Sequence, residues 1–251
     1  MKPKPQSNYK PNSIRDDCQT PPEAVASVVY FLRKAGISLV WEPCTGEGLI
    51  AQALREAGLD VVETDLQTGQ DFETCEKPVG VEAIVTNPPF SAAAMFAGRC
   101  KSHGLPWALL LKDDAASASR FRAACWSQEI IRHPTYQKII PSRRISFKMP
   151  KKGWFTHKKD KKKRIIGISN NAAQFHTYWY CAGFNLPYSE IETNYEQVKR
   201  LELAVSLGAV FVYDDDFIRA VPGPDCSFDE RQLNKIIDLG SAIINPKIAG
   251  I

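Results

Sequence analysis

Four consecutive residues, Asn87, Pro88, Pro89 and Phe90, have the types and spacing best suited to chemistry in this chain of 251 residues. Two successive prolines fix the backbone and remove two amide donors, so this Asn-Pro-Pro-Phe motif is a stiff loop. It offers carbonyl oxygens, one side-chain amide and one aromatic ring. Such a set suits a planar group that carries an amine, because the oxygens accept its N–H bonds and the ring stacks on its face. A proline-stiffened turn without chemistry is the alternative.

The elements around the motif place it at a ligand-binding edge. Residues 81–85 are apolar and predict a buried strand, and residues 91–100, rich in Ala, Met and Phe, predict a helix. The motif therefore follows the carboxyl end of a strand, and ligands bind at that edge in open α/β sheets.

A second stretch predicts another loop at the same edge. Residues 39–48 form an apolar strand that runs into a glycine turn, and a helix is expected from residue 49. Gly46 and Gly48 let the backbone approach a ligand closely at the amino end of that helix. Asp65 ends the next apolar run, about 20 residues after Glu42, where an acid holds the ribose in nucleoside-binding folds. The third glycine of the dinucleotide pattern is absent, which argues against NAD.

These motifs, in this order, resemble the S-adenosylmethionine-dependent amino-methyltransferases that act on N6 of adenine in DNA, including small phage and bacterial members. The resemblance spans about residues 17–185 and rests on residues 42–48 (Glu-Pro-Cys-Thr-Gly-Glu-Gly), Asp65, Asp71-Phe72, the Asn-Pro-Pro-Phe motif and residues 19–23 (Gln-Thr-Pro-Pro-Glu). It implies an α/β, Rossmann-like class I methyltransferase fold with a mostly parallel central sheet and helices on both faces. Fifteen residues, 66–80, separate the second and third expected strands, so the region after the second strand is expected to be trimmed.

The resemblance also implies S-adenosylmethionine as the cofactor. Asp65 would hold its ribose, Asp71 and Phe72 its adenine, and Thr20 would approach its methionine end. The full expected cofactor-binding set is Thr20, Glu42, Pro43, Cys44, Gly46, Gly48, Asp65, Asp71, Phe72 and Asn87. Two alternatives remain open: Thr20 simply caps the helix that follows it, in a capping box with Glu23, and Asp71 and Phe72 decorate a surface loop.

The expected catalytic residues are the four of the Asn-Pro-Pro-Phe motif. The Asn87 side-chain oxygen and the Pro88 carbonyl would accept hydrogen bonds from the target amine, and these bonds strengthen as positive charge develops on nitrogen. Phe90 would stack on the base, which must be flipped out of a duplex or presented single-stranded. Pro43-Cys44 is similar to the nucleophile pair of cytosine-carbon methyltransferases, but it falls in the glycine loop, so we interpret Cys44 as a packing residue.

Positive charge is concentrated in residues 148–164, the basic segment, which has nine basic residues and one acid. The rest of the chain has 23 basic and 27 acidic residues, so it is mildly acidic. We expect the basic segment to contact phosphates, and a solvated loop is the alternative. The expected nucleic-acid-binding residues are Lys151, Lys152, Lys158, Lys159, Lys161, Lys162, Lys163 and Arg164.

The predicted organisation has three parts: a disordered tail (1–17), a catalytic domain with the basic insertion (18–185), and a small α/β appendage (186–251). In the catalytic domain, residues 136–140 and 143–147 predict a strand broken at Pro141, and residues 174–180 predict the closing strand. In the appendage, the patterns predict a helix (189–207), a strand (209–213) and a helix (229–239).

Composition narrows the function further. The 44% hydrophobic content supports a sizeable core, and no run of eighteen apolar residues or signal-type segment occurs, so we expect a cytoplasmic protein without a membrane partner. Seven scattered cysteines and four histidines show no ligand spacing, so neither disulfides nor a metal site is expected. Nothing indicates the oligomeric state.

The sequence thus predicts a methyltransferase that modifies the exocyclic N6 amine of adenine in DNA. Phe after Asn-Pro-Pro resembles the adenine enzymes, and the basic segment favours nucleic acid over protein. Three alternatives stay open: methylation of an RNA base, methylation of a protein glutamine, and a non-catalytic nucleic-acid-binding protein with a vestigial cofactor fold.

Overall fold

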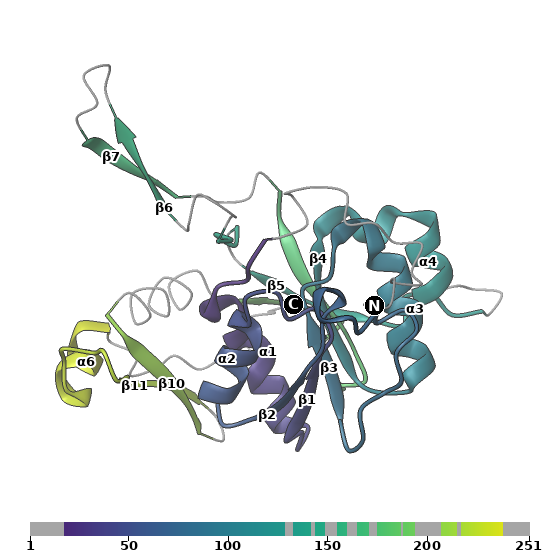
Figure 1. Cartoon of the computed structure of the whole chain (residues 1–251), viewed down its shortest axis with the longest axis horizontal. Coiled ribbons are helices and arrows are strands. Elements are labelled where there is room, and N and C mark those ends of the chain that lie inside the picture. The colour runs from purple at the N-terminus through teal and green to yellow at the C-terminus, as the bar shows by residue number, and fades with distance from the viewer. Residues whose placement is uncertain are drawn as a thin grey trace.

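The main element is a seven-stranded sheet with the strand order β2-β1-β3-β4-β8-β5-β9 (Figure 1). The computed structural model describes residues 18–128, 133–141, 144–148, 155–159, 165–170, 175–186, 188–193, 207–214 and 217–237. The sheet strands are β1 (Leu39–Glu42), β2 (Asp60–Glu63), β3 (Ala83–Thr86), β4 (Trp107–Lys112), β5 (Gln137–Pro141), β8 (Thr177–Ala182) and β9 (Glu190–Thr193). The pairs among β1 to β4 are parallel, β5 and β9 are parallel, and β8 runs antiparallel between β4 and β5.

Helices cover both faces of this sheet. They are α1 (Pro22–Lys34), α2 (Leu49–Glu56), α3 (Ala93–His103) and α4 (Ser119–Cys125), with 3-10 turns η1 (Leu66–Thr68), η2 (Phe90–Ala92) and η3 (Asp113–Ser117). Figure 1 shows α1 and α2 on one side of the strands and α3 and α4 on the other. Along β4, Ala108 and Leu110 join the core cluster that contains α1 and α2, whereas Leu109 and Leu111 join the cluster that contains α3. Continuous apolar strands are expected when both faces are covered, and the Rossmann-like α/β fold is confirmed.

The sheet has a topological switch point beside β1. The chain passes from β1 outward to β2 and then crosses to β3, which pairs with the other side of β1. In such sheets the ligand crevice lies outside the carboxyl ends of the two strands where the order reverses. Glu42 ends β1, and Asn87 directly follows β3. The two loops predicted to carry the chemistry therefore meet at this crevice.

The region after β2 is short, as predicted. Residues 64–82 are all described, and they contain the 3-10 turn η1 and loops, with no strand and no α-helix. As a result β2 is the edge strand of the sheet. The loop from Asp65 to Asp71 consequently stays next to the crevice.

Helix α1 begins one residue later than a capping box requires. The expected inner stripe is present, since Val25, Val28, Val29 and Leu32 are fully buried. However, the N-cap is Pro21, which is extended at φ −72° and ψ 150° and makes no side-chain capping bond. Pro22 disfavours the helical conformation for Pro21, the residue before it. The helix therefore begins at Pro22, and Thr20 lies outside it. The alternative prediction that Thr20 caps this helix was therefore wrong.

Two further predictions of secondary structure were wrong in the residues that the structure describes. Residues 144–147 form no strand, and Lys148 makes only an isolated bridge to Gln19. The predicted helix 189–207 begins instead as the strand β9, which extends the main sheet past residue 185, and residues 194–206 lie outside the described part of the chain. The side chain of Gln137 on β5 donates to the Leu186 and Tyr188 carbonyls at 2.8 Å each and accepts from Leu186 N at 2.9 Å. These bonds hold the chain against β5 and favour pairing there over a helix.

A separate hairpin has its first strand within the basic segment and its second strand just after it. Strands β6 (Phe155–Lys159) and β7 (Ile165–Asn170) pair antiparallel and project away from the main sheet (Figure 1). Lys158 and Lys159 lie on β6. The predicted tail 1–17 lies outside the described residues. So do the other expected nucleic-acid-binding residues, which are Lys151, Lys152, Lys161, Lys162, Lys163 and Arg164.

The C-terminal region forms a second small unit. Strands β10 (Ala209–Asp214) and β11 (Phe217–Pro222) make an antiparallel hairpin, followed by α6 (Glu230–Ile237). The sequence predicted β10 and α6 but missed β11. Leu233 on α6 is fully buried in the cluster shared with α1 and α2, so α6 packs against the same hydrophobic core as these helices. No helix in the described part of the chain is long and apolar enough to cross a membrane.

Candidate active site

A cavity of about 270 Å³ lies at the switch point. The glycine loop after β1, the Asp65 to Phe72 loop after β2 and the Asn-Pro-Pro-Phe motif after β3 all contribute to its walls. Every residue expected to bind the cofactor lines this cavity except Gly48: Thr20, Glu42, Pro43, Cys44, Gly46, Asp65, Asp71, Phe72 and Asn87. The structure thus brings together residues that lie up to 67 positions apart in the chain.

The two glycines of the loop have different structural roles. Gly46 has a φ of +55°, which L side chains rarely adopt, and a Cβ atom there would lie 2.7 Å from Gln19 Nε2, so a side chain would displace that of Gln19. Gly48 has a φ of +80°, is the N-cap of α2 and does not line the cavity. Gly46 therefore shapes the cavity, whereas Gly48 allows the helix to begin.

Asp65 joins the first two loops. Its Oδ2 accepts a hydrogen bond from Gly46 N at 3.0 Å, and its Oδ1 accepts from Gln67 N at 2.7 Å and so caps η1. Each carboxylate oxygen can accept a further bond. The side chain can therefore receive a hydroxyl donor in the cavity while it fixes the glycine loop.

Asp71 and Phe72 are placed differently from each other. Asp71 Oδ1 accepts from Glu73 N at 3.0 Å, whereas Asp71 Oδ2 is buried without a partner. The Phe72 ring is 3% exposed and stacks on Phe96 with centroids 4.7 Å apart, with Trp41 edge-on at 5.1 Å. Phe72 is therefore a core residue that forms a wall, and the alternative that it decorates a surface loop was wrong.

Of three other groups on the cavity wall, Glu42 and Thr20 are buried and Cys44 is half-buried. Glu42 is 1% exposed, its Oε2 has no partner, and the buried Oγ1 of Thr20 likewise has none. Burial raises the pKa of Glu42 well above its ordinary value, and the negative charge of Glu63 adds to the rise. Burial also raises the pKa of the Cys44 thiol. A neutral thiol is a poor nucleophile, which agrees with a packing role for Cys44.

The Asn87 amide is held in one orientation. Its Nδ2 donates to the Cys18 carbonyl at 2.9 Å. A carbonyl oxygen can only accept, so the amide nitrogen must face Cys18 and Oδ1 must point away from it. Asn87 Oδ1 is buried and has no hydrogen-bond partner. Buried acceptors are rarely left unpaired, so this atom has the character of a ligand-binding acceptor.

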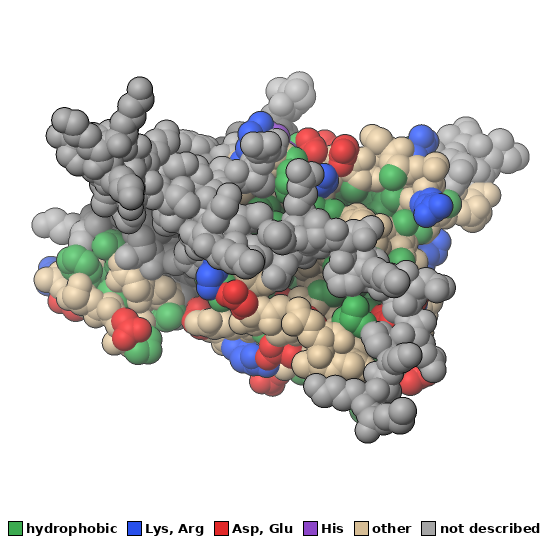
Figure 2. Space-filling model, turned by 45° about the horizontal axis from the view of Figure 1, so that its top comes forward, with side chains coloured by type: hydrophobic (Ala, Val, Ile, Leu, Met, Phe, Trp, Pro, Cys, Tyr) green, Lys and Arg blue, Asp and Glu red, His purple; other side chains and the backbone are tan. Residues whose placement is uncertain are grey.

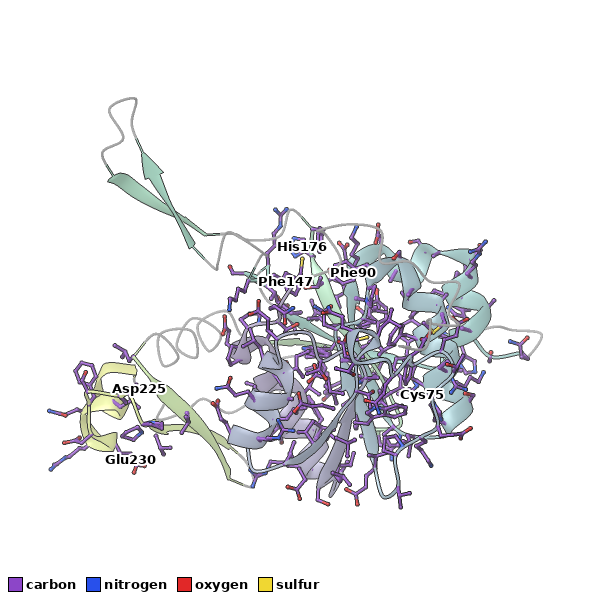
Figure 3. All side chains as sticks on the ribbon, in the orientation of Figure 1. Cys75, Phe90, Phe147, His176, Asp225 and Glu230 are labelled. Carbon is purple, nitrogen blue, oxygen red and sulfur yellow. The ribbon has the colours of Figure 1, made fainter. Side chains whose placement is uncertain are left out.

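Beside the cavity lies an aromatic pair that the sequence did not predict. Phe90 does not line the cavity but packs edge-on against Phe175 with centroids 5.4 Å apart. Lys112 Nζ lies 4.7 Å from the Phe175 centroid and 5.9 Å from that of Phe90. Figure 3 labels Phe90 at the upper end of the main sheet, below the hairpin of β6 and β7. Phe175 lay within the aromatic run that predicted the closing strand, but only the antiparallel pairing of Lys112 with Thr177 brings it to Phe90.

Charges on the described surface are mixed. On the face that Figure 2 presents, acidic and basic side chains of described residues are interspersed. Lys148, the first residue of the basic segment, pairs with Glu47 of the glycine loop at 2.7 Å. Within the described residues, no group of three His, Cys, Asp or Glu side chains is placed to hold a metal ion.

Comparisons with known proteins give little more. No protein-family model matches the chain, and no curated protein matches it. Among solved structures, the chain is similar to the crystal structure of 23S rRNA methyltransferase ErmE, with 14% identity and a TM-score of 0.31, over 73% of this chain and 76% of that one. The fold assignment accordingly rests on the sheet order and on the helices that cover both faces.

Proposed function

We propose that the protein is an S-adenosylmethionine-dependent methyltransferase that modifies the N6 amine of adenine in DNA. The observation that carries the proposal is the Asn87 amide, which is fixed by the Cys18 carbonyl and presents a buried, unpartnered Oδ1 beside the cavity. An acceptor held in this way can orient an amine without moving, which is the property expected of a preorganised catalytic hydrogen bond.

The cavity residues fit S-adenosylmethionine. This cofactor carries a positive sulfonium, an ammonium group, ribose hydroxyls and an adenine amine, and all but the sulfonium donate hydrogen bonds. The cavity offers the carboxyl groups of Glu42, Asp65 and Asp71, and Glu42 and Asp71 each have a buried oxygen without a hydrogen-bond partner. Opposite charges attract strongly where water is excluded, so the cavity suits a cationic ligand better than an anionic one.

When bound, S-adenosylmethionine supplies an electrophilic methyl group to the site. The chain would position the amine that receives it: Asn87 Oδ1 and the Pro88 carbonyl accept the two N–H bonds of the amine and direct its lone pair toward the cavity. As nitrogen gains positive charge, both hydrogen bonds strengthen, so they stabilise the transition state more than the ground state. The amine later releases one proton to solvent. No thiol or metal is required for these steps.

The aromatic pair would receive the base. Phe90 directly follows the two prolines, and Phe175 packs against it. A base stacked at Phe90 would bring its exocyclic amine to Asn87, and aromatic stacking contributes about 1 to 3 kcal/mol per base. The base must leave its duplex to reach this position. The basic segment would hold the phosphates around it.

Transfer of a labelled methyl group tests the proposal against its alternatives. The wild type is incubated with labelled S-adenosylmethionine and, separately, duplex DNA, single-stranded DNA, RNA and a mixed protein extract, and calorimetry checks cofactor binding. We expect binding, and label in DNA that digests to N6-methyladenine. Label only in RNA or in glutamine would replace the proposed substrate. Tight DNA binding without cofactor binding would favour the non-catalytic alternative.

A further inference from the structure

Residues 18–20, which we call the strap, touch both sides of the cavity. The Cys18 carbonyl accepts the bond from Asn87 Nδ2 at 2.9 Å. One residue on, Gln19 Oε1 accepts from Glu47 N at 3.0 Å, and the Gln19 side chain occupies the space that a side chain at Gly46 would need. The strap thus holds the glycine loop with one residue and the catalytic amide with its neighbour.

Lys148 contacts both the strap and the glycine loop. Gln19 N donates to the Lys148 carbonyl at 3.0 Å, and Lys148 N donates to the Gln19 carbonyl at 3.0 Å. The Lys148 ammonium reaches across to Glu47 Oε2 at 2.7 Å. Gln19, Glu47 and Lys148 therefore form a closed ring of contacts that joins three segments distant in the sequence.

The role that we infer for this ring of contacts depends on its position beside the cavity and not on the energy of its ion pair. The Lys148 and Glu47 side chains are 39% and 53% exposed, and ion pairs this exposed contribute little to the stability of a fold. The ion pair between Lys148 and Glu47, however, involves the same glycine loop to which the Gln19 side chain is hydrogen-bonded. Gln19 in turn directly follows Cys18, whose carbonyl orients the Asn87 amide. A change in the ring is therefore transmitted to the cavity wall and to the acceptor.

We propose that the strap and Lys148 form a clasp that couples occupancy of the cofactor cavity to the orientation of the Asn87 amide. Gln19 and Lys148 are the positioning residues of this clasp. A ligand in the cavity contacts Thr20 and Gly46, holds the strap in place, and so keeps the Cys18 carbonyl on Asn87 Nδ2. The inference rests on the proposed function, because it assumes that the cavity binds the cofactor and that Asn87 holds the target amine.

Charge reversal tests the outer part of the clasp. Lys148→Glu and Glu47→Lys each break the ion pair and place like charges together, so each should weaken cofactor affinity by about three- to fivefold, the upper range for an exposed pair. The double variant restores opposite charges and should return to within about twofold of wild type. Calorimetry with S-adenosylmethionine gives all four affinities, and thermal unfolding confirms that each variant is folded.

Lys138 provides the matched control. Its ammonium pairs with Glu190 at 2.6 Å between β5 and β9, Glu190 is as exposed as Glu47, and neither Lys138 nor Glu190 lines the cavity. Lys138→Glu should leave cofactor affinity unchanged. If Lys148→Glu and Glu47→Lys also leave it unchanged while the wild type binds, the clasp is refuted. If the wild type itself fails to bind S-adenosylmethionine, the proposed cofactor is wrong instead.

Gln19→Met tests the inner connection, because methionine keeps the length but removes the acceptor. It should weaken cofactor affinity and also lower the turnover number at saturating cofactor, by about tenfold each. In an Asn87→Ala background it should still weaken affinity but lower turnover no further, since the amide it positions is gone. Equal losses of turnover in both backgrounds would show that the strap does not act through Asn87.

Discussion

Replacing Glu42 by Gln removes one ionisable group from the cavity wall and keeps its shape. Burial and the charge of Glu63 raise the pKa of Glu42 in the folded protein above its value of 4.5 in an open chain. Between these two pKa values the folded protein holds one proton that the unfolded chain has lost. The stability from this proton is complete below the lower value and is lost as pH rises through the raised one.

The size of the pH dependence of stability follows from the binding of this one proton. Where it is held by the folded state alone, the free energy of unfolding falls by about 1.4 kcal/mol for each pH unit. The glutamine side chain of the variant cannot titrate, so the stability of the variant should lack this slope. Urea unfolding of the cofactor-free wild type and Glu42→Gln, from about pH 5 to 8, gives both curves under identical conditions.

We expect the variant to gain stability relative to the wild type steadily as pH rises above 4.5. The difference should level off once Glu42 is ionised in the folded wild type. Two parallel curves would refute the reasoning, because they would mean that Glu42 holds no extra proton in the folded state. Glu82→Gln serves as a control, since the pKa of that exposed carboxyl is lowered by hydrogen bonds from Ser38 and Leu39 and its removal should not produce the same slope.

Three other outcomes are expected. Asp65→Ala should weaken cofactor binding by at least about 1.5 kcal/mol in calorimetry, because a charged acceptor is removed, and unchanged affinity would remove Asp65 from the site. Phe90→Ala should lower both the rate and the affinity for a DNA with an unpaired target base, since stacking contributes about 1 to 3 kcal/mol, and normal affinity would place the base elsewhere. In the basic segment, the residues to be replaced by serine are Lys158, Lys159, Lys161, Lys162 and Lys163. The slope of log affinity for DNA against log salt concentration should become flatter by about 0.9 for each phosphate that is no longer neutralised. An unaltered slope would exclude the segment from DNA binding.

The sequence predicted the edge of the sheet where the candidate site lies. Apolar runs ending in glycine or proline are local signals, and the parallel strands β1 and β3 bring Glu42 and Asn87 to the same crevice. The short region after β2 was also evident, because residue spacing alone limits what can fold there. These features depend on neighbours in the chain, so the sequence contains them directly.

The missed features depend on contacts between distant segments. Phe175 reaches Phe90 only because β8 runs antiparallel to β4, and the sequence does not reveal that direction. Gln19 and Lys148 meet 129 positions apart in an isolated bridge. At residues 189–193 the pattern for a helix competed with hydrogen bonds from Gln137, which hold the chain for β9. Tertiary contacts overrode local propensity there.

The methyl-transfer rate of Asn87→Ala on DNA tests the central claim most directly. Asn87 presents the unpartnered acceptor, so its loss should act on turnover more than on binding. We predict that affinities for S-adenosylmethionine and DNA stay within a few fold of wild type. The rate of N6-methyladenine formation, measured by mass spectrometry of nucleosides, should fall at least about a hundredfold, as when one preorganised transition-state hydrogen bond is removed. A variant that stays fully active, or a wild type that marks only cytosine, would contradict the account.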